Sequence, residues 1–241
     1  MKILITNDDG IKSEGLRHLV QWARKVGDVF VVAPKNEQSA KAQSINLREA
    51  FEVKESDEFS DLGIRSIAVD STPADCIRYA IDKLEKFDMV FSGINRGLNL
   101  GYDVAYSGTC GATFEANYSG VPAAAFSAEP DGLEKASKQL DAIWAFVTSH
   151  KLFEHGLMYN INVPKEPRGI RLTAQGGYYF RDHFIPDGDD MYRAKPYVAY
   201  KMPSEPSENM DIDAIHLGFC SISPLVIDRT DKETLKKLLA Q

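Results

Sequence analysis

The chain has 241 residues, 44% of them hydrophobic and 26% charged, which is the composition of an ordinary globular protein with a full core. Its formal net charge of -7 argues against a general nucleic-acid binder, so an anionic ligand would need a local positive charge such as a metal ion. The sequence lacks a membrane-length apolar run and a basic, cleavable leader, so we expect a cytoplasmic protein without membrane contact.

The first part of the chain alternates strands with helices. The apolar run before "NDDG" predicts a buried strand, residues 13–26 carry apolar side chains at helical spacing, and "DVFVVAP" predicts a second strand. The pattern repeats, and the further elements expected are a strand at 64–69, a helix at 72–85, a strand from Asp88, a helix at 109–117, a strand in "VPAAAFS" and a helix at 133–150. This order predicts an α/β fold with a doubly wound, mostly parallel, Rossmann-like sheet. Ligands bind such sheets beyond the carboxyl ends of the strands.

The pattern changes after residue 159. "YNINVP" predicts one more strand, whereas residues 164–206 are rich in Pro, Gly and aromatic residues and predict a β-rich arm instead of another βαβ unit. "AIHLGFCSISPL" and a short helix close the chain. We therefore expect a single domain, 1–241, with an α/β core at 1–160, a hairpin or oligomerisation arm at about 161–210, and a C-terminal strand and helix at 211–241.

Polar side chains gather directly after three of the predicted parallel strands. Asp8 and Asp9 follow the first strand, "KNEQSA" with Asn36 and Ser39 follows the second, and "INRGLNLGYDVAYSGT" follows the strand that begins at Asp88. Adjacent carboxylates at a buried strand end need a compensating charge, and carboxylate, hydroxyl and amide oxygens suit Mg²⁺ or Mn²⁺. The alternative interpretation of "NDDG" is an ordinary turn, because Asn, Asp and Gly are common turn formers.

The third of these loops also has the features of a phosphate site. Its glycines let the backbone approach a ligand, and "YSGT" opens a helix whose free N–H groups favour a phosphate. Ser107 and Thr109 would add hydroxyl donors beside the backbone N–H of Gly108. Ser and Thr at a helix start are also common caps, so it is the occurrence of this loop together with the acidic pair that favours the phosphate interpretation.

At these motifs the sequence resembles the stationary-phase survival protein SurE family. The shared motifs, in chain order, are "NDDG" at 7–10, "APKNEQS" at 33–39, "STPADC" at 71–76 and "SGINRGLNLGYDVAYSGTCGAT" at 92–113, with weaker similarity at "YNINVP" and "GFCSISPL". The chain departs from the family pattern at Ser71, Cys110 and Thr113, where the family has Gly, Val and Ala. None of these departures falls on an expected metal ligand.

The resemblance implies a divalent-metal-dependent phosphomonoesterase, a 5′-nucleotidase that hydrolyses nucleoside monophosphates, with 3′-nucleotidase and exopolyphosphatase activities as further expectations. It implies one Mg²⁺ or Mn²⁺ per subunit, with the metal ligands Asp8, Asp9, Ser39 and Asn95. Asp8 and Asp9 are also the expected catalytic residues. The expected phosphate-binding residues are Asn7, Asn99, Ser107, Gly108 and Thr109.

The resemblance also implies a homodimer or homotetramer built through exchanged arms, acting on a small-molecule nucleotide and not on a nucleic-acid duplex. Aromatic residues in "GGYYFRDHF" would then either stack on a base or make contacts between subunits. Two other phosphoryl-handling classes fit less well. A haloacid-dehalogenase-type phosphatase needs a second Asp two residues after its nucleophile, where this chain has Gly10, and a receiver domain needs an Asp where "DMVFSG" ends in Ser92 and Gly93.

Overall fold

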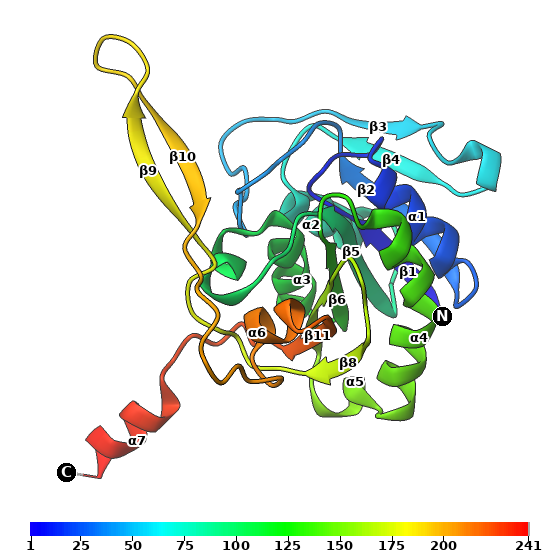
Figure 1. Cartoon of the computed structure of the whole chain (residues 1–241). Helices are drawn as coiled ribbons and strands as arrows, with labels where there is room; N and C mark the ends of the chain where they lie inside the picture. The colour runs from blue at the N-terminus through cyan, green and yellow to red at the C-terminus, as the bar shows by residue number, and fades with distance from the viewer. Residues whose placement is uncertain (241) are drawn as a thin grey trace.

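In the computed structural model, which describes residues 1–240, a nine-stranded sheet runs through the centre of the molecule (Figure 1). Its strands are β1 (Lys2–Thr6), β2 (Asp28–Pro34), β3 (Val53–Ser56), β4 (Ser66–Val69), β5 (Met89–Arg96), β6 (Ala123–Ala128), β7 (Met158–Val163), β8 (Gly169–Leu172) and β11 (Phe219–Pro224). The spatial order is β3-β4-β2-β1-β5-β6-β7-β11-β8. In this spatial order every neighbouring pair from β4 through β2, β1, β5 and β6 to β7 is parallel. Within the sheet only β3 and β11 introduce antiparallel pairing, at β3–β4 and β11–β7. The predicted doubly wound, mostly parallel fold is confirmed.

Helices cover both faces of this sheet. They are α1 (Glu14–Ala23), α2 (Pro73–Lys83), α3 (Gly108–Tyr118), α4 (Leu133–Ser149) and the short α5 (Leu152–His155) and α6 (Asp211–His216). Ile3 and Ile5 of β1 pack into one core with α1 and α4, whereas Leu4 packs into a second core with α2 and α3. Because β1 is buried on both faces, its sequence is a continuous apolar run without alternation.

The sequence pattern did not predict every element. β3 is a short edge strand with the polar sequence "VKES", so it carries no apolar signal, and α6 has only six residues, two of them acidic near its start. α1 ends at Ala23 instead of Val26 because Lys25 and Val26 donate their N–H groups to carbonyls three residues back, which closes the helix in a tight turn.

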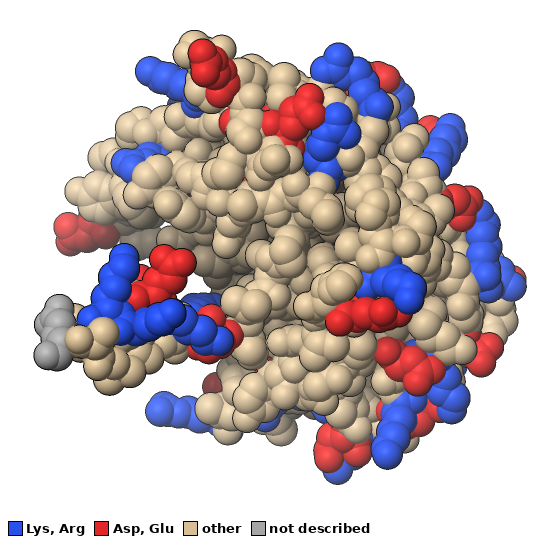
Figure 2. Space-filling model, turned by 90° about the horizontal axis from the view of Figure 1, so that it is seen from below, with Lys and Arg blue, Asp and Glu red and all other residues tan. Residues whose placement is uncertain are grey.

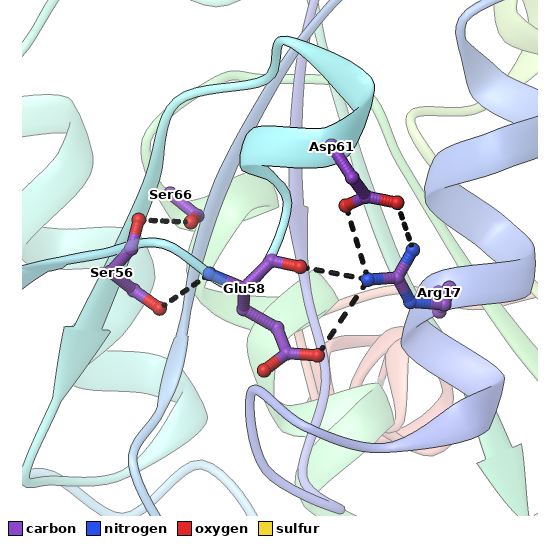
Figure 3. A network of polar contacts seen from close by, with 5 residues as sticks. All are labelled: Arg17, Ser56, Glu58, Asp61 and Ser66. Carbon is purple, nitrogen blue, oxygen red and sulfur yellow. Dashed lines mark hydrogen bonds and ion pairs between the residues drawn. The ribbon is translucent and has the colours of Figure 1, made fainter.

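Arg17 on α1 ties this helix to the turn between β3 and β4 (Figure 3). Its guanidinium donates to both carboxylate oxygens of Asp61, at 2.9 and 3.2 Å, and to the carbonyl oxygen of Glu58 at 2.8 Å. The hydroxyl of Ser66 donates to the carbonyl of Ser56 at 2.9 Å and joins the ends of the two strands. These bonds hold the edge of the sheet against α1.

Two segments extend from the core (Figure 1). β9 (Phe180–Pro186) and β10 (Tyr192–Val198) pair only with each other, and every residue of both strands is exposed. This hairpin is the β-rich arm predicted as part of the fold. It leaves the core after β8, which is itself part of the large sheet. α7 (Lys232–Leu239) is the second segment, and none of its residues is buried.

Basic and acidic side chains are interspersed on the face of the molecule shown in Figure 2, without a broad patch of one sign. A duplex-binding protein needs a basic face to neutralise phosphates, and the face in this view does not provide one. No helix within residues 1–240 is both long and apolar enough to span a bilayer.

Candidate functional site

The three polar loops meet at one edge of the sheet, because β2, β1 and β5 are adjacent parallel strands whose carboxyl ends lie side by side. Together with the 3₁₀ helix η2 (Gly101–Tyr106) they enclose a cleft of about 360 Å³. The residues that line it are Asp8, Asp9, Glu37, Ser39, Ala40, Asn95, Arg96, Leu98, Asn99, Asp103, Tyr106, Ser107 and Phe180. All four expected metal ligands are therefore in this cleft.

Asp8 lies at the inner wall of the cleft and is only 5% exposed. Its Oδ1 accepts a hydrogen bond from the hydroxyl of Thr109 at 2.5 Å. Burial raises the pKa of the Asp8 carboxyl to about 6, against the lowering effect of this hydrogen bond. The backbone of Gly108 packs directly on this side chain, and a Cβ at position 108 would lie 2.8 Å from the Asp8 Cβ, so glycine is required there.

Asp9 is more open than Asp8 and accepts the backbone N–H of Arg96 at 3.1 Å. Burial raises the pKa of its carboxyl, and the neighbouring Glu37 raises it further. Within residues 1–240 no Lys or Arg side chain forms an ion pair with Asp8 or Asp9. The positive charge of Arg96, which also lines the cleft, lowers the pKa of the Asp9 carboxyl without an ion pair, so a single, more distant cation faces two adjacent carboxylates.

Ser39 and Asn95 add the other two oxygens. The Ser39 hydroxyl donates to Glu37 Oε1 at 2.5 Å, and the Asn95 amide nitrogen donates to the Gly97 carbonyl at 2.7 Å, which leaves Asn95 Oδ1 available. Asn95 follows an irregularity where the pairing of β5 with β6 shifts register. Gly93 makes this possible, because it has a φ of +128° and a Cβ there would lie 2.2 Å from the carbonyl oxygen of Phe126.

The donor set fits a hard divalent cation. It combines two carboxylates, one hydroxyl and one amide oxygen, which are the oxygen ligands that Mg²⁺ and Mn²⁺ prefer. In the described residues no group of three or more His, Cys, Asp or Glu side chains is arranged to hold a metal. A cation in this cleft would therefore depend on Ser39 and Asn95 as well as on Asp8 and Asp9.

The expected phosphate-binding residues at the start of α3 fall into two groups. Ser107 lines the cleft, and its oxygen caps α3 by accepting the N–H of Cys110 at 3.0 Å. Gly108 and Thr109 lie behind it against Asp8, and Thr109 is fully buried. The Thr109 hydroxyl therefore faces Asp8, whereas Ser107 lines the cleft.

The two asparagines in the same prediction also differ. Asn99 lines the cleft, whereas Asn7 is fully buried and lies outside the cleft lining. The amide nitrogen of Asn7 donates to the Gly10 carbonyl at 2.9 Å and to the Ser13 hydroxyl at 2.6 Å. Since a phosphate needs donors and these are engaged, Asn7 holds the "NDDG" turn in shape.

Asn99 is fixed by two side chains that sequence reasoning did not select. Asn160 and Asn162 on β7 donate their amides to the Asn99 carbonyl at 2.8 and 2.9 Å, and Asn162 Oδ1 accepts the Asn99 N–H at 2.8 Å. The Asn99 amide nitrogen donates to Ser127 Oγ at 2.8 Å, which leaves its second hydrogen for the cleft. The signal in the sequence was "YNINVP", where two amides alternate with apolar residues in a fully buried strand.

Comparison with family models matches residues 3–182 to the family described as "Survival protein SurE". The chain belongs to the SurE family. It is 36% identical over 245 residues to 5′-nucleotidase SurE 1 of Thermus thermophilus (99% of this chain, 96% of the relative). It is also 36% identical over 247 residues to 5′-nucleotidase SurE of Caldanaerobacter subterraneus subsp. tengcongensis (98% and 95%). The crystal structure of the SurE protein from Aquifex aeolicus has a TM-score of 0.78 to this chain at 29% identity, and 100% of both chains is covered.

These SurE relatives confirm the family resemblance inferred from the motifs. The match to the SurE family model spans β1, β2 and β5 and the loops that follow them, which is the part of the chain that builds the cleft. The likeness to the curated SurE relatives extends through the arm and the C-terminal segment as well, because it covers nearly the whole chain.

Proposed function

We propose that this protein is a 5′-nucleotidase that hydrolyses nucleoside monophosphates to nucleoside and phosphate. The observation that carries the proposal is the pair Asp8 and Asp9 just after β1, two adjacent carboxylates that form no ion pair, in a cleft that also presents Ser107 at a helix start. Its support is the activity named for the curated relatives, whose sequences match over nearly the whole chain.

The proposed metal ligands are Asp8, Asp9, Ser39 and Asn95, holding one Mg²⁺ or Mn²⁺ per subunit. Such an ion would supply the positive charge that draws a phosphate oxygen into an acidic cleft and lowers the pKa of a bound water. Thr109 orients Asp8 by its hydrogen bond, and the backbone N–H of Arg96 orients Asp9. Both carboxylates are thus positioned by the protein before any ligand arrives.

The remaining phosphate oxygens would be bound at the start of α3. The first N–H groups of a helix have no partner within the helix, and the helix dipole favours negative charge at this end. Gly108 contributes such an N–H beside the hydroxyl of Ser107, and Asn99 contributes its remaining amide hydrogen. Phosphate monoesters react through a loose in-line transition state, so this positioning and charge stabilisation account for catalysis without a covalent phosphoenzyme.

A substrate panel tests the proposal. Phosphate release is measured from AMP, 3′-AMP, p-nitrophenyl phosphate and tripolyphosphate, each with EDTA, Mg²⁺ or Mn²⁺. We expect metal-dependent release from AMP, and the panel also decides whether 3′-nucleotidase and exopolyphosphatase activities accompany it. Failure to release phosphate from AMP with either ion, by protein of native fold, would refute the proposal.

A further inference from the structure

The cleft continues into a second, larger cavity of about 910 Å³ beside η2 and the base of the arm. The largest group among its lining residues is aromatic, Tyr102, Tyr106, Tyr178, Phe180 and Phe184, and the charged residues Arg181 and Asp182 line it as well. The two cavities have four lining residues in common, Ala40, Asp103, Tyr106 and Phe180. This common border is called the shared wall below. The polar cleft and the aromatic cavity are therefore neighbouring compartments.

Asp103 is the only charged residue in this shared wall, among the residues that the structure describes. Its Oδ2 accepts the backbone N–H of Phe180 at 2.9 Å, and its other carboxylate oxygen accepts no hydrogen bond within residues 1–240. Within residues 1–240 no Lys or Arg side chain forms an ion pair with the Asp103 carboxylate. A carboxylate so placed repels a phosphate and attracts hydroxyl donors.

We infer that Asp103 accepts hydrogen bonds from the ribose hydroxyls of a nucleoside 5′-monophosphate and selects for substrates that carry them. The inference rests on the proposed function, because it places the phosphate beside Asp8 and Asp9. The order phosphate, ribose, base in the substrate then matches the order polar cleft, shared wall, aromatic cavity in the protein. Aromatic faces on the far side of the wall suit a base, which stacks on them.

Asp103 also holds Phe180 at the start of β9, so a purely structural role has to be separated from substrate selection. Asp103→Ala removes both acceptors. Asp103→Asn keeps a carbonyl oxygen for the Phe180 N–H and replaces the free acceptor with an NH₂ donor. Loss of structure at Phe180 lowers turnover of every nucleotide, whereas loss of a ribose contact lowers turnover only of substrates with ribose hydroxyls.

The experiment compares kcat/KM for AMP and for 2′,3′-dideoxyadenosine 5′-monophosphate, which lacks both hydroxyls. For wild type we expect a preference for AMP of roughly 10- to 100-fold, the size of a hydrogen bond to a charged acceptor. In Asp103→Ala and Asp103→Asn this preference falls toward one, mainly through a loss for AMP. Asp187→Ala is the control, because this carboxylate lies in the arm, pairs with Arg193 and lines neither cavity, and it keeps the wild-type preference.

A wild-type protein that hydrolyses both nucleotides equally well contradicts the inference and leaves the proposed function intact. The same holds if both Asp103 variants, folded by circular dichroism, lower kcat/KM for the two substrates by the same factor. A protein that hydrolyses neither nucleotide in Mg²⁺ or Mn²⁺ refutes the inference together with the proposed function.

Discussion

The hydroxyl of Thr109, in the first turn of α3, donates to Asp8 Oδ1 at the end of β1 over 2.5 Å. This bond joins the strand that carries the acidic pair to the helix whose start faces the cleft. Both side chains are buried, so water does not compete for the contact. Hydrogen bonds to a charged acceptor in such surroundings are short and strong.

Thr109→Val should therefore weaken both the site and the fold. Valine keeps the branched shape but removes the donor, so we expect a loss of about 1.5–3 kcal/mol in the free energy of unfolding and a weaker affinity for Mn²⁺. Urea denaturation and isothermal titration measure the two effects. Thr113→Val is the control, because Thr113 is fully buried on the same helix but donates to the Cys110 carbonyl outside the cleft. Equal Mn²⁺ affinity in the two variants would contradict the role given to Thr109.

Metal removal should abolish phosphatase activity. After chelation with EDTA and gel filtration we expect no turnover of AMP, and added Mg²⁺ or Mn²⁺ should restore it. The physical reason is that Asp8 and Asp9 place two negative charges in the cleft, which repel a phosphate unless a cation is present. Full activity after exhaustive chelation would remove the metal from the proposal.

Asp8→Asn should lower Mn²⁺ affinity and turnover together, with partial rescue at high metal concentration. The amide oxygen still accepts the Thr109 hydroxyl, so the geometry is kept while one negative charge is lost. Titration calorimetry and steady-state kinetics at several Mn²⁺ concentrations measure both quantities. If Asp8→Asn binds Mn²⁺ as tightly as wild type, Asp8 is not a ligand.

Ser107→Ala should reduce turnover while metal affinity stays close to that of wild type. Ser107 lines the cleft at the start of α3, so its replacement should delete the hydroxyl proposed as a phosphate donor, and comparable losses in other enzymes lower kcat by roughly 10²-fold. Because the same hydroxyl caps α3, a melting curve must accompany the kinetics. A loss of metal binding in Ser107→Ala would mean that this loop, and not "NDDG", holds the ion.

The exposed arm should make contacts between subunits, so light scattering at micromolar concentration should give a dimer or tetramer. An isolated two-stranded hairpin is marginally stable in water, yet β9 and β10 expose large side chains such as Phe184, Ile185 and Tyr192. Phe180 and Val198 face each other across the hairpin base, so residues 181–197 can be replaced by a short Gly-Ser linker. We expect this variant to be a folded monomer, and a wild-type monomer would contradict the prediction.

The fold was predictable from sequence wherever an element buries an apolar face. β1, β2 and β5 are apolar runs, so their order and the position of the polar loops after them followed directly. β3 was not predictable, because "VKES" is an exposed edge strand without an apolar pattern. Its pairing with β4 depends on tertiary contacts that no local pattern encodes.

The membership of the site was predictable more readily than the direction in which each side chain points. Asp8, Asp9, Ser39 and Asn95 line one cleft, as the three adjacent loops indicated. Thr109 could not be distinguished from Ser107 by sequence, because the orientation of the start of α3 decides which of the two residues contacts Asp8 and which lines the cleft. Asp103 was missed because a single acid in a loop carries no signal until the second cavity is seen beside it.

The contact between Asp8 and Thr109 spans 101 positions of the chain. During synthesis the acidic pair emerges early, but the helix that secures it emerges only after β1, β2, β4 and β5 have been made. Closing so long a loop lowers the conformational entropy of the chain, and the contacts within the site do not offset this cost. The sheet must therefore assemble first. A nascent chain that ends before α3 therefore carries the "NDDG" motif without a finished site, and tight Mn²⁺ binding would mark the packing of α3 against the end of β1.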